Sequence, residues 1–383
     1  MAIRALLNSI RIQGYRPFGD FTAKLGPLEV LVGSNGSGKS SLFEFLRFLR
    51  DSVNQDIPPE IVPGGIGQQI FHIPGKERFN WDIDVEMEPY APVKYKGELV
   101  GPIGHTHISY EKVLNSITLM DVRERNGIAY DNENSEYREQ EISLKRTNQL
   151  ALSAITNPRL TNLYHLREYI SGWRFYSSFN INNDKIRKST PLEQEPVLRE
   201  DAGNLSSVLH YLMTEHYQIF DELQQCIRLA VPGFKGLLVK ARGGPGEVIA
   251  FWREQGIDQD LSLADLSDGI LRLICWMVLC MHPNPPGLIC IDEPDQGVHP
   301  RTLPILAGLF EKASDRTQIL LATHSSYFLT QFDISSIAVM RKSAGDIEFL
   351  KPADSAIMTE NLSDFGIEEI EAMHISDELE RLS

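Results

Sequence analysis

The sequence predicts an α/β fold in which one domain of parallel strands and helices is split by two insertions. Residues 27–32 form an apolar run that ends on a glycine-rich turn, after which apolar residues recur at helical spacing from Leu42 to Leu49. Apolar runs at 288–291 and 318–323, separated by a helical pattern, predict two buried strands. Between these parts, apolar and polar residues alternate in short runs, which predicts antiparallel strands.

The segment between the two parts contains two kinds of pattern. Residues from about Trp81 to Leu152 alternate between turn signals, whereas residues 158–232 have helical periodicity interrupted by glycines and prolines, so a long coiled coil is excluded. A further pair of runs around Gly243 predicts a hairpin. We therefore expect a single split domain over residues 1–383. Its parts are an N-terminal lobe (1–55), an antiparallel β insertion (70–155), a helical insertion (156–235), a lobe that starts with the hairpin (236–345) and a C-terminal strand and helix tail (346–383).

Composition predicts where the protein is located but does not identify its partners. The formal net charge of the 383 residues is −15, which gives no basic surface for coating nucleic acid, although a local basic groove remains compatible with it. The N-terminus reads as a strand and not as a signal peptide, and no stretch reaches the roughly 18 apolar residues of a membrane span. We expect a cytoplasmic protein with no membrane partner. Its four cysteines lie among apolar neighbours and are expected to be free buried thiols.

The glycine-rich turn matches the phosphate-binding pattern G-x-x-x-x-G-K-[ST] between a strand and a helix. In such a P-loop the backbone N–H groups surround phosphate oxygens at the start of the helix, Lys39 reaches the β and γ phosphates, and the Ser40 hydroxyl ligates Mg²⁺. The sequence therefore predicts ATP and Mg²⁺ as ligands of the N-terminal, or P-loop, lobe. The expected nucleotide-binding residues here are Ser34, Asn35, Gly36, Ser37, Gly38, Lys39, Ser40 and Ser41.

The apolar run at 288–291 ends in two carboxylates, Asp292 and Glu293. With a P-loop upstream, this is the pattern of a Walker B strand. Asp292 is expected to hold Mg²⁺ through water, and Glu293 is expected to act as the general base that polarises the attacking water.

Two further motifs have a structural and a functional reading. Ser267 opens a helix in Leu266-Ser-Asp-Gly-Ile270, where it can simply cap the helix, or bind an anion together with the first backbone amides. His324 follows the buried run at 318–323, where a histidine can be structural or can sense the γ-phosphate.

In this order, the four motifs resemble those of ABC-type ATPases of the RecF, SMC and OLD lineage, in particular RecF-like bacterial ATPases without a long coiled coil or a TOPRIM domain. The resemblance covers most of residues 1–340. It implies a P-loop NTPase of ABC type, a two-lobed head with an antiparallel β insertion and a helical insertion. It also implies an ATP-dependent homodimer, in which Ser267 and Gly269 of one subunit close on the γ-phosphate bound by the other subunit.

The chain departs from the usual ABC pattern at two positions. Asp268 replaces the usual glycine of the signature and brings a carboxylate near a phosphate, and His299 stands where transporters have an aspartate, in a Gly-x-His-Pro form typical of this lineage. Gln68 and Gln69 are candidates for the Q-loop, or belong to a surface loop. Two aromatic residues of the N-terminal lobe are read either as stacking on adenine or as core residues: Tyr15 and Phe18.

Several functions are compatible with such an ATPase. The first is a clamp gated by ATP that acts on DNA or on a separately encoded effector protein, in DNA repair or anti-phage defence, and a variant of it is a regulatory, antitoxin-like scaffold with little DNA contact. A transporter subunit does not fit the long insertion between Ser41 and Ser267. An OLD-type nuclease would need a paired-aspartate strand after His324, and the sequence there has none. Five basic residues could contact DNA phosphates or belong to solvated loops: Lys185, Arg187, Lys188, Lys240 and Arg242.

Overall fold

The computed structural model describes residues 4–62, 70–131, 138–178, 184–242, 244–343 and 345–354. Within these ranges the chain forms two compact units. The first contains residues up to Trp173 and the segment that begins at Ile334, and the second runs from Arg174 to Asp333. Gln68 and Gln69, and the tail beyond residue 354, lie outside the described residues.

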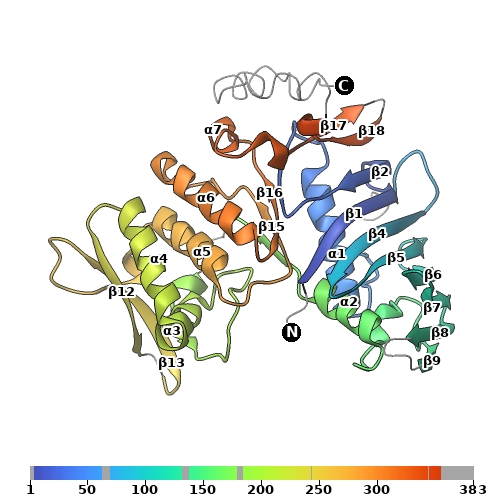
Figure 1. Cartoon of the computed structure of the whole chain (residues 1–383), viewed down its shortest axis with the longest axis horizontal. Coiled ribbons are helices and arrows are strands. Elements are labelled where there is room, and N and C mark those ends of the chain that lie inside the picture. The colour runs from blue at the N-terminus through green and yellow to red at the C-terminus, as the bar shows by residue number, and fades with distance from the viewer. Residues whose placement is uncertain are drawn as a thin grey trace. The chain divides into compact units, whose positions relative to one another are not determined.

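An antiparallel sheet of eight strands dominates the first unit, in the order β2-β1-β4-β5-β6-β7-β8-β9 (Figure 1). The alternation that predicted these strands reflects burial, since alternate residues of β4 are buried. The strands are β1 (Arg4–Tyr15), β2 (Phe18–Lys24), β4 (Arg78–Glu88), β5 (Tyr90–Val100), β6 (His107–Leu114), β7 (Thr118–Arg123), β8 (Asn126–Asp131) and β9 (Arg138–Ser143).

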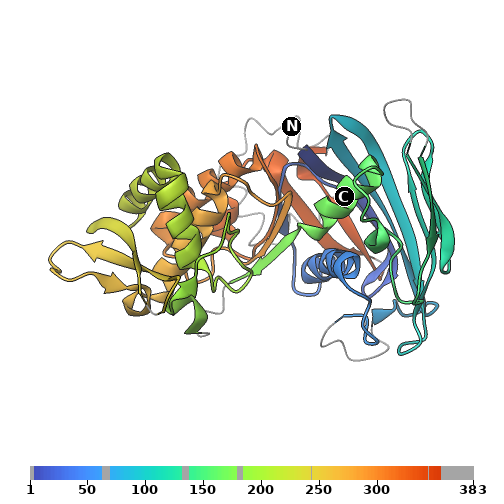
Figure 2. The same cartoon turned by 90° about the horizontal axis from the view of Figure 1, so that it is seen from below.

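Two helices, α1 (Lys39–Asn54) and α2 (Thr161–Ser171), pack beside this sheet in the first unit (Figure 2). Phe48 of α1 forms edge-on contacts with Phe79 and Trp81 of β4, with ring centroids 5.4 and 6.2 Å apart. Strands β3 (Leu28–Val32), β17 (Ile337–Ser343) and β18 (Asp346–Leu350) complete the unit. β3 pairs with β17 in parallel, which fixes the strand that enters the P-loop.

The predicted alternative that Tyr15 and Phe18 are core residues is the one observed. Both side chains are fully buried. Tyr15 packs edge-on against Phe45 of α1, and its hydroxyl donates a hydrogen bond to Glu44. Phe18 packs beneath the P-loop, where a Cβ added to Gly38 would come within 3.0 Å of its ring. Neither ring is open to an adenine base.

The second unit has a parallel arrangement of β10 (Arg174–Ser177), β15 (Leu288–Asp292) and β16 (Gln318–Ala322). Helices α5 (Asp268–Met281) and α6 (Leu303–Ser314) pack on each other, and the short helix α7 (Ser326–Leu329) follows β16. The predicted strands at 288–291 and 318–323 and the predicted helix near 303–313 are confirmed. The prediction of helical structure over 158–232 was wrong at β10, because this short strand is stabilised by pairing with β15, more than 100 residues away.

The rest of the second unit consists of helices α3 (Leu205–Glu215) and α4 (Tyr217–Ala230) beside the predicted hairpin, β12 (Phe234–Ala241) and β13 (Glu247–Glu254) (Figure 1). Two short strands, β11 (Thr190–Pro191) and β14 (Leu261–Ser262), also pair with β13. All four cysteines are free, as expected, but Cys226 is only half-buried. No helix in the described part of the chain is long and apolar enough to cross a bilayer.

A carboxylate is fully buried in the first unit, at Glu111 of β6. It accepts hydrogen bonds from the backbone N–H groups of Ala151 and Leu152, the second at 2.9 Å, and from the Tyr95 hydroxyl at 2.9 Å. Burial raises the pKa of Glu111 to about 7, although the two backbone hydrogen bonds and the one from Tyr95 lower it.

This raised pKa predicts a pH-dependent stability. The folded state keeps the Glu111 carboxyl protonated at pH values above its ordinary pKa of 4.5. The stability that this proton contributes is fully present below pH 4.5 and is lost as the pH rises through about 7. The loss in the free energy of unfolding is expected to be about 3 kcal/mol, at about 1.4 kcal/mol per pKa unit. Urea unfolding at pH 5 and pH 8 measures it, and Glu111→Gln should reduce the difference. The same substitution at exposed Glu141 controls for the loss of one negative charge, and an unchanged difference in Glu111→Gln would contradict the prediction.

Candidate nucleotide-binding and hydrolysis site

The P-loop of the first unit connects β3 to α1, as predicted. Gly33 follows β3, and a Cβ at this position would lie 2.1 Å from the Met340 carbonyl oxygen of β17, so only glycine fits between the two strands. Gly38 is the N-cap of α1 and has a left-handed backbone with φ of 96°. Helix α1 therefore begins at Lys39 with its first backbone N–H groups at the loop, as phosphate binding requires.

Lys39 is held by the loop itself. Its side chain is 5% exposed, and its ammonium group donates hydrogen bonds to the carbonyl oxygens of Gly33 at 2.5 Å and Ser34 at 3.3 Å. A third hydrogen bond goes to the Ser37 hydroxyl at 3.3 Å. Phosphate oxygens can replace these acceptors, because a lysine ammonium has three donors and binds phosphate as a compact charge. Ser34, Asn35, Gly36 and Ser40 are exposed on this loop, and Ser41 lies within the first turn of α1.

The two Walker B carboxylates belong to the second unit, at the carboxyl end of β15. Asp292 is the last residue of the strand, and Glu293 has φ of 56°, a left-handed conformation that is strained for a residue with a side chain. The Glu293 N–H donates a hydrogen bond to the Ala322 carbonyl oxygen at 2.8 Å, which ties the turn to β16. A strained backbone maintained by such contacts is typical of a functional position.

His324 lies at the end of the neighbouring strand β16 and faces Glu293. The distance between His324 Nε2 and Glu293 Oε1 is 3.8 Å, and both side chains are partly exposed. This distance is too long for a direct hydrogen bond. A carboxylate that can accept a proton thus lies beside an imidazole that can donate a hydrogen bond.

A residue that the sequence analysis missed, Asp295, fixes this arrangement. The Thr323 hydroxyl donates a hydrogen bond to Asp295 Oδ1 at 2.7 Å, and the Ser325 N–H donates to the Thr323 oxygen at 3.0 Å. The loop after Glu293 is thus bound to the turn that carries His324. Asp295 could have been found from its place two residues after the Walker B pair, but its partner could not, because Thr323 is 28 residues away.

The structural reading of Ser267 is observed, and its role toward a phosphate stays a prediction. Its hydroxyl caps α5 by accepting a hydrogen bond from the Ile270 N–H at 3.4 Å, and its side chain is exposed. Gly269 is required by close packing, since a Cβ there would lie 2.6 Å from the Gly297 carbonyl oxygen. Ser267, Gly269, Gly297 and His299 line one cavity of about 930 Å³ in the second unit.

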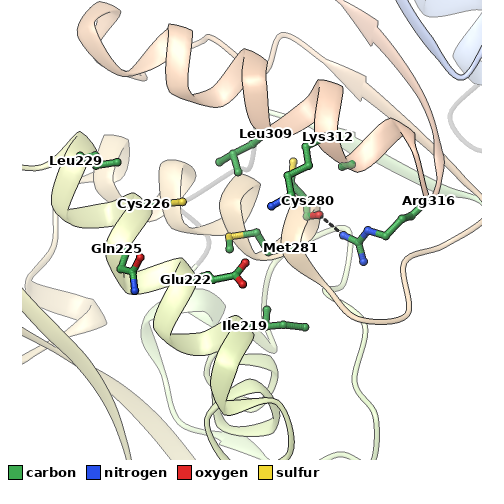
Figure 3. Close-up of a pocket in the computed structure, with 11 residues that line it drawn as sticks. Ile219, Glu222, Gln225, Cys226, Leu229, Cys280, Met281, Leu309, Lys312 and Arg316 are labelled. Atoms are coloured by element: carbon green, nitrogen blue, oxygen red, sulfur yellow. Dashed lines mark hydrogen bonds between the residues drawn. The ribbon is translucent and has the colours of Figure 1, made fainter.

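Another cavity of the second unit lies apart from these residues. It has a volume of about 430 Å³ and lies between α4, the end of α5 and α6 (Figure 3). Its lining includes Cys226, Met281 and Leu309, with Glu222 and Lys312 at its polar side, and none of the candidate site residues. The candidate site residues lie instead on the P-loop of the first unit and at the strand ends of β15 and β16 in the second unit.

Four of the five basic residues considered for DNA binding contact other groups of the second unit. Lys185 pairs with Asp201 at 2.8 Å, and Lys240 pairs with Asp260 at 2.5 Å and lies over the Phe251 ring. Arg242 lies over the same ring, and Arg187 is bonded to the segment before α5.

Each unit offers an oxygen donor of the kind that Mg²⁺ prefers, the Ser40 hydroxyl in the first and the Asp292 carboxylate in the second. Mg²⁺ is usually held by one or two such groups together with waters and substrate phosphates. Among the described residues, no three or more His, Cys, Asp or Glu side chains gather as a metal cage. When bound, Mg²⁺ would neutralise charge on the nucleotide phosphates.

Comparison with known families decides the class of the protein. Residues 29–330 match the family described as "AAA domain, putative AbiEii toxin, Type IV TA system". The chain belongs to this family. Members are P-loop ATPases, so the match establishes the nucleotide-binding class, and it covers the P-loop, the Walker B pair and His324. No curated protein sequence matches the chain.

Solved structures confirm the predicted fold of this family member. It is similar to the Smc head domain with an extended coiled coil, bound to the C-terminal domain of ScpA, derived from Pyrococcus furiosus, with a TM-score of 0.58 and 11% identity. That alignment covers 94% of this chain and 100% of the other. An SmcHead bound to the C-winged helix domain of ScpA gives a TM-score of 0.55 at 12% identity, over 92% and 99% of the two chains. The α/β P-loop fold with an antiparallel sheet is thereby confirmed, and it is similar to the fold of these Smc heads.

Proposed function

We propose that this chain is a slow ATPase that hydrolyses ATP to ADP and phosphate, and that ATP drives two copies together. The observation that carries the proposal is the facing pair Glu293 and His324 at the ends of neighbouring parallel strands. In the proposed reaction Glu293 accepts a proton from the attacking water and His324 donates a hydrogen bond to the γ-phosphate. Asp292 and Ser40 hold Mg²⁺, and the P-loop binds the triphosphate.

The proposed dimer uses the face of the second unit that carries Ser267 and Gly269. These residues line the cavity of about 930 Å³ together with the loop that follows Glu293. A cavity beside a helix N-terminus suits a phosphate group supplied by another subunit. In the proposed dimer, each active site combines the P-loop of one subunit with Ser267 and Gly269 of the other.

The biological role that we propose is control of a separate effector protein by this dimer, in anti-phage defence or DNA repair. The family description, with its putative toxin of a toxin–antitoxin system, supports a regulatory role. The similar Smc heads were solved bound to domains of ScpA, which supports an ATPase head that works with a protein partner. DNA is the alternative partner, and the internal pairing of the basic residues favours the effector protein.

Mixing two inactive variants tests the composite site. Lys39→Ala removes the phosphate-binding ammonium of one subunit, and Ser267→Arg fills the phosphate-facing position of the other. Neither homodimer should hydrolyse ATP. A mixed dimer has one site with both changes and one with neither, so the mixture should regain part of the wild-type phosphate release. The control is Ser267→Arg alone, assayed at several total protein concentrations. A mixture with no more activity than its two components alone would argue against the shared site.

A further inference from the structure

Arg187 contacts the turn that precedes the signature helix α5. It ends a short 3-10 helix, Asp184–Arg187, and its side chain is 20% exposed. One guanidinium nitrogen, Nη1, donates to the carbonyl oxygens of Leu263, Ala264 and Leu266, at 3.2, 2.9 and 2.9 Å. The other, Nη2, donates to Asp268 Oδ1 at 2.6 Å. A single side chain thus holds the backbone before Ser267 and the carboxylate after it.

The backbone around Arg187 is itself anchored, so the guanidinium is held in place. Ile186 is buried, and the Ser189 hydroxyl donates a hydrogen bond to Glu247 of β13 at 2.6 Å. Thr190 pairs with Val248 in the sheet. A guanidinium fixed in this way loses little rotational freedom when it binds its acceptors, and its planar fork presents five donors in fixed directions, which a lysine ammonium does not.

The charge of Asp268 makes this contact functionally significant. Asp268 lies between Ser267 and Gly269, the two residues that the proposed dimer places against a γ-phosphate. A free carboxylate there would repel the phosphate, since like charges a few ångströms apart destabilise an interface. The Asp268 side chain is 47% exposed, so solvent screens part of this repulsion in the single subunit, but closure of a dimer would remove that solvent.

We propose that Arg187 is a positioning residue for the ATP-dependent dimer. It neutralises Asp268 and fixes the turn at 263–266, so that Ser267 and the first N–H groups of α5 can bind the γ-phosphate held by the other subunit. This inference rests on the proposed function. It assigns to the helical insertion, which carries Arg187, a direct influence on the face that closes on a second copy.

The test uses the full chain in the Glu293→Gln background, where ATP is bound but not consumed. Light scattering at several protein concentrations gives the dimer affinity with ATP. Adding Arg187→Ala is expected to weaken the dimer about tenfold, because the unneutralised carboxylate is only partly screened. Calorimetric affinity for ATP in the single subunit should stay unchanged. Lys185→Ala, which removes a cation from the same 3-10 helix, is the matched control and should dimerise as the background does.

Two further variants separate charge neutralisation from a purely structural role. Arg187→Ala combined with Asp268→Asn removes the repulsion and should recover part of the lost affinity, and Arg187→Lys, which keeps the charge, should fall between Ala and the background. If Arg187→Ala unfolds, the comparison of Arg187→Lys with and without Asp268→Asn takes its place. Dimerisation of Arg187→Ala equal to the background, or no recovery in the double variant, would overturn the inference. If Glu293→Gln itself does not dimerise with ATP, the proposed function fails instead.

Discussion

Glu293→Gln is expected to bind ATP normally and to lower the turnover by roughly 10² to 10⁴. Glutamine keeps the shape of the side chain, but its amide cannot accept the proton of the attacking water. The left-handed turn at Glu293 and its backbone hydrogen bond to Ala322 do not depend on the side-chain charge, so the geometry of the strand end should persist. Phosphate release measures the turnover, and calorimetry measures the affinity for ATP.

The control for Glu293→Gln is Glu311→Gln, which removes an exposed carboxylate from α6 of the same unit. It should hydrolyse ATP as the wild-type protein does. If Glu293→Gln itself kept the wild-type rate, another group would have to be the base. His324 would then be the first residue to replace, because its imidazole lies 3.8 Å from the Glu293 carboxylate.

Lys39→Ala should weaken ATP binding by at least about 100-fold while the protein stays folded. The ammonium is already directed into the loop by three oxygen acceptors, and its loss removes the charge that would meet the β and γ phosphates. Titration calorimetry measures the affinity, and thermal unfolding checks the fold. Arg47→Ala, which removes an exposed cation from the same helix, is the control. Equal affinity in Lys39→Ala and the wild-type protein would refute the P-loop assignment.

The parts of the fold that could be predicted from the sequence are those with a local cause. The turn from Gly33 to Ser40 is encoded by glycines, since Gly33 lies against the Met340 backbone and Gly36 and Gly38 have left-handed backbones. The strand before Asp292 is a continuous apolar run. The alternation in β4 follows directly from one buried and one solvent-facing side. In each case the determining pattern lies within about ten residues of the feature.

The features that sequence reasoning missed depend on contacts between distant segments. Strand β10 exists because it pairs with β15, and its own four residues carry no clear strand pattern. Arg187 was read as a DNA contact or a solvated cation, because its acceptors at 263–268 lie about 80 residues further along the chain. The effect of Asp268 was therefore only half predicted: the carboxylate was recognised, but its neutralising partner was not.

The segment from Glu293 to His299 has one further consequence. One end carries the proposed base, its middle is bound through Asp295 to the turn that carries His324, and Gly297 packs against Gly269 with no room for a methyl group. Seven residues therefore connect the proposed base to the face that the proposed dimer would use. A shift at one end cannot be absorbed by a gap at the other, because the Gly269 and Gly297 backbones are already in contact. In the proposed dimer, we therefore expect hydrolysis at Glu293 to shift, through this segment, the surface that meets the neighbouring subunit.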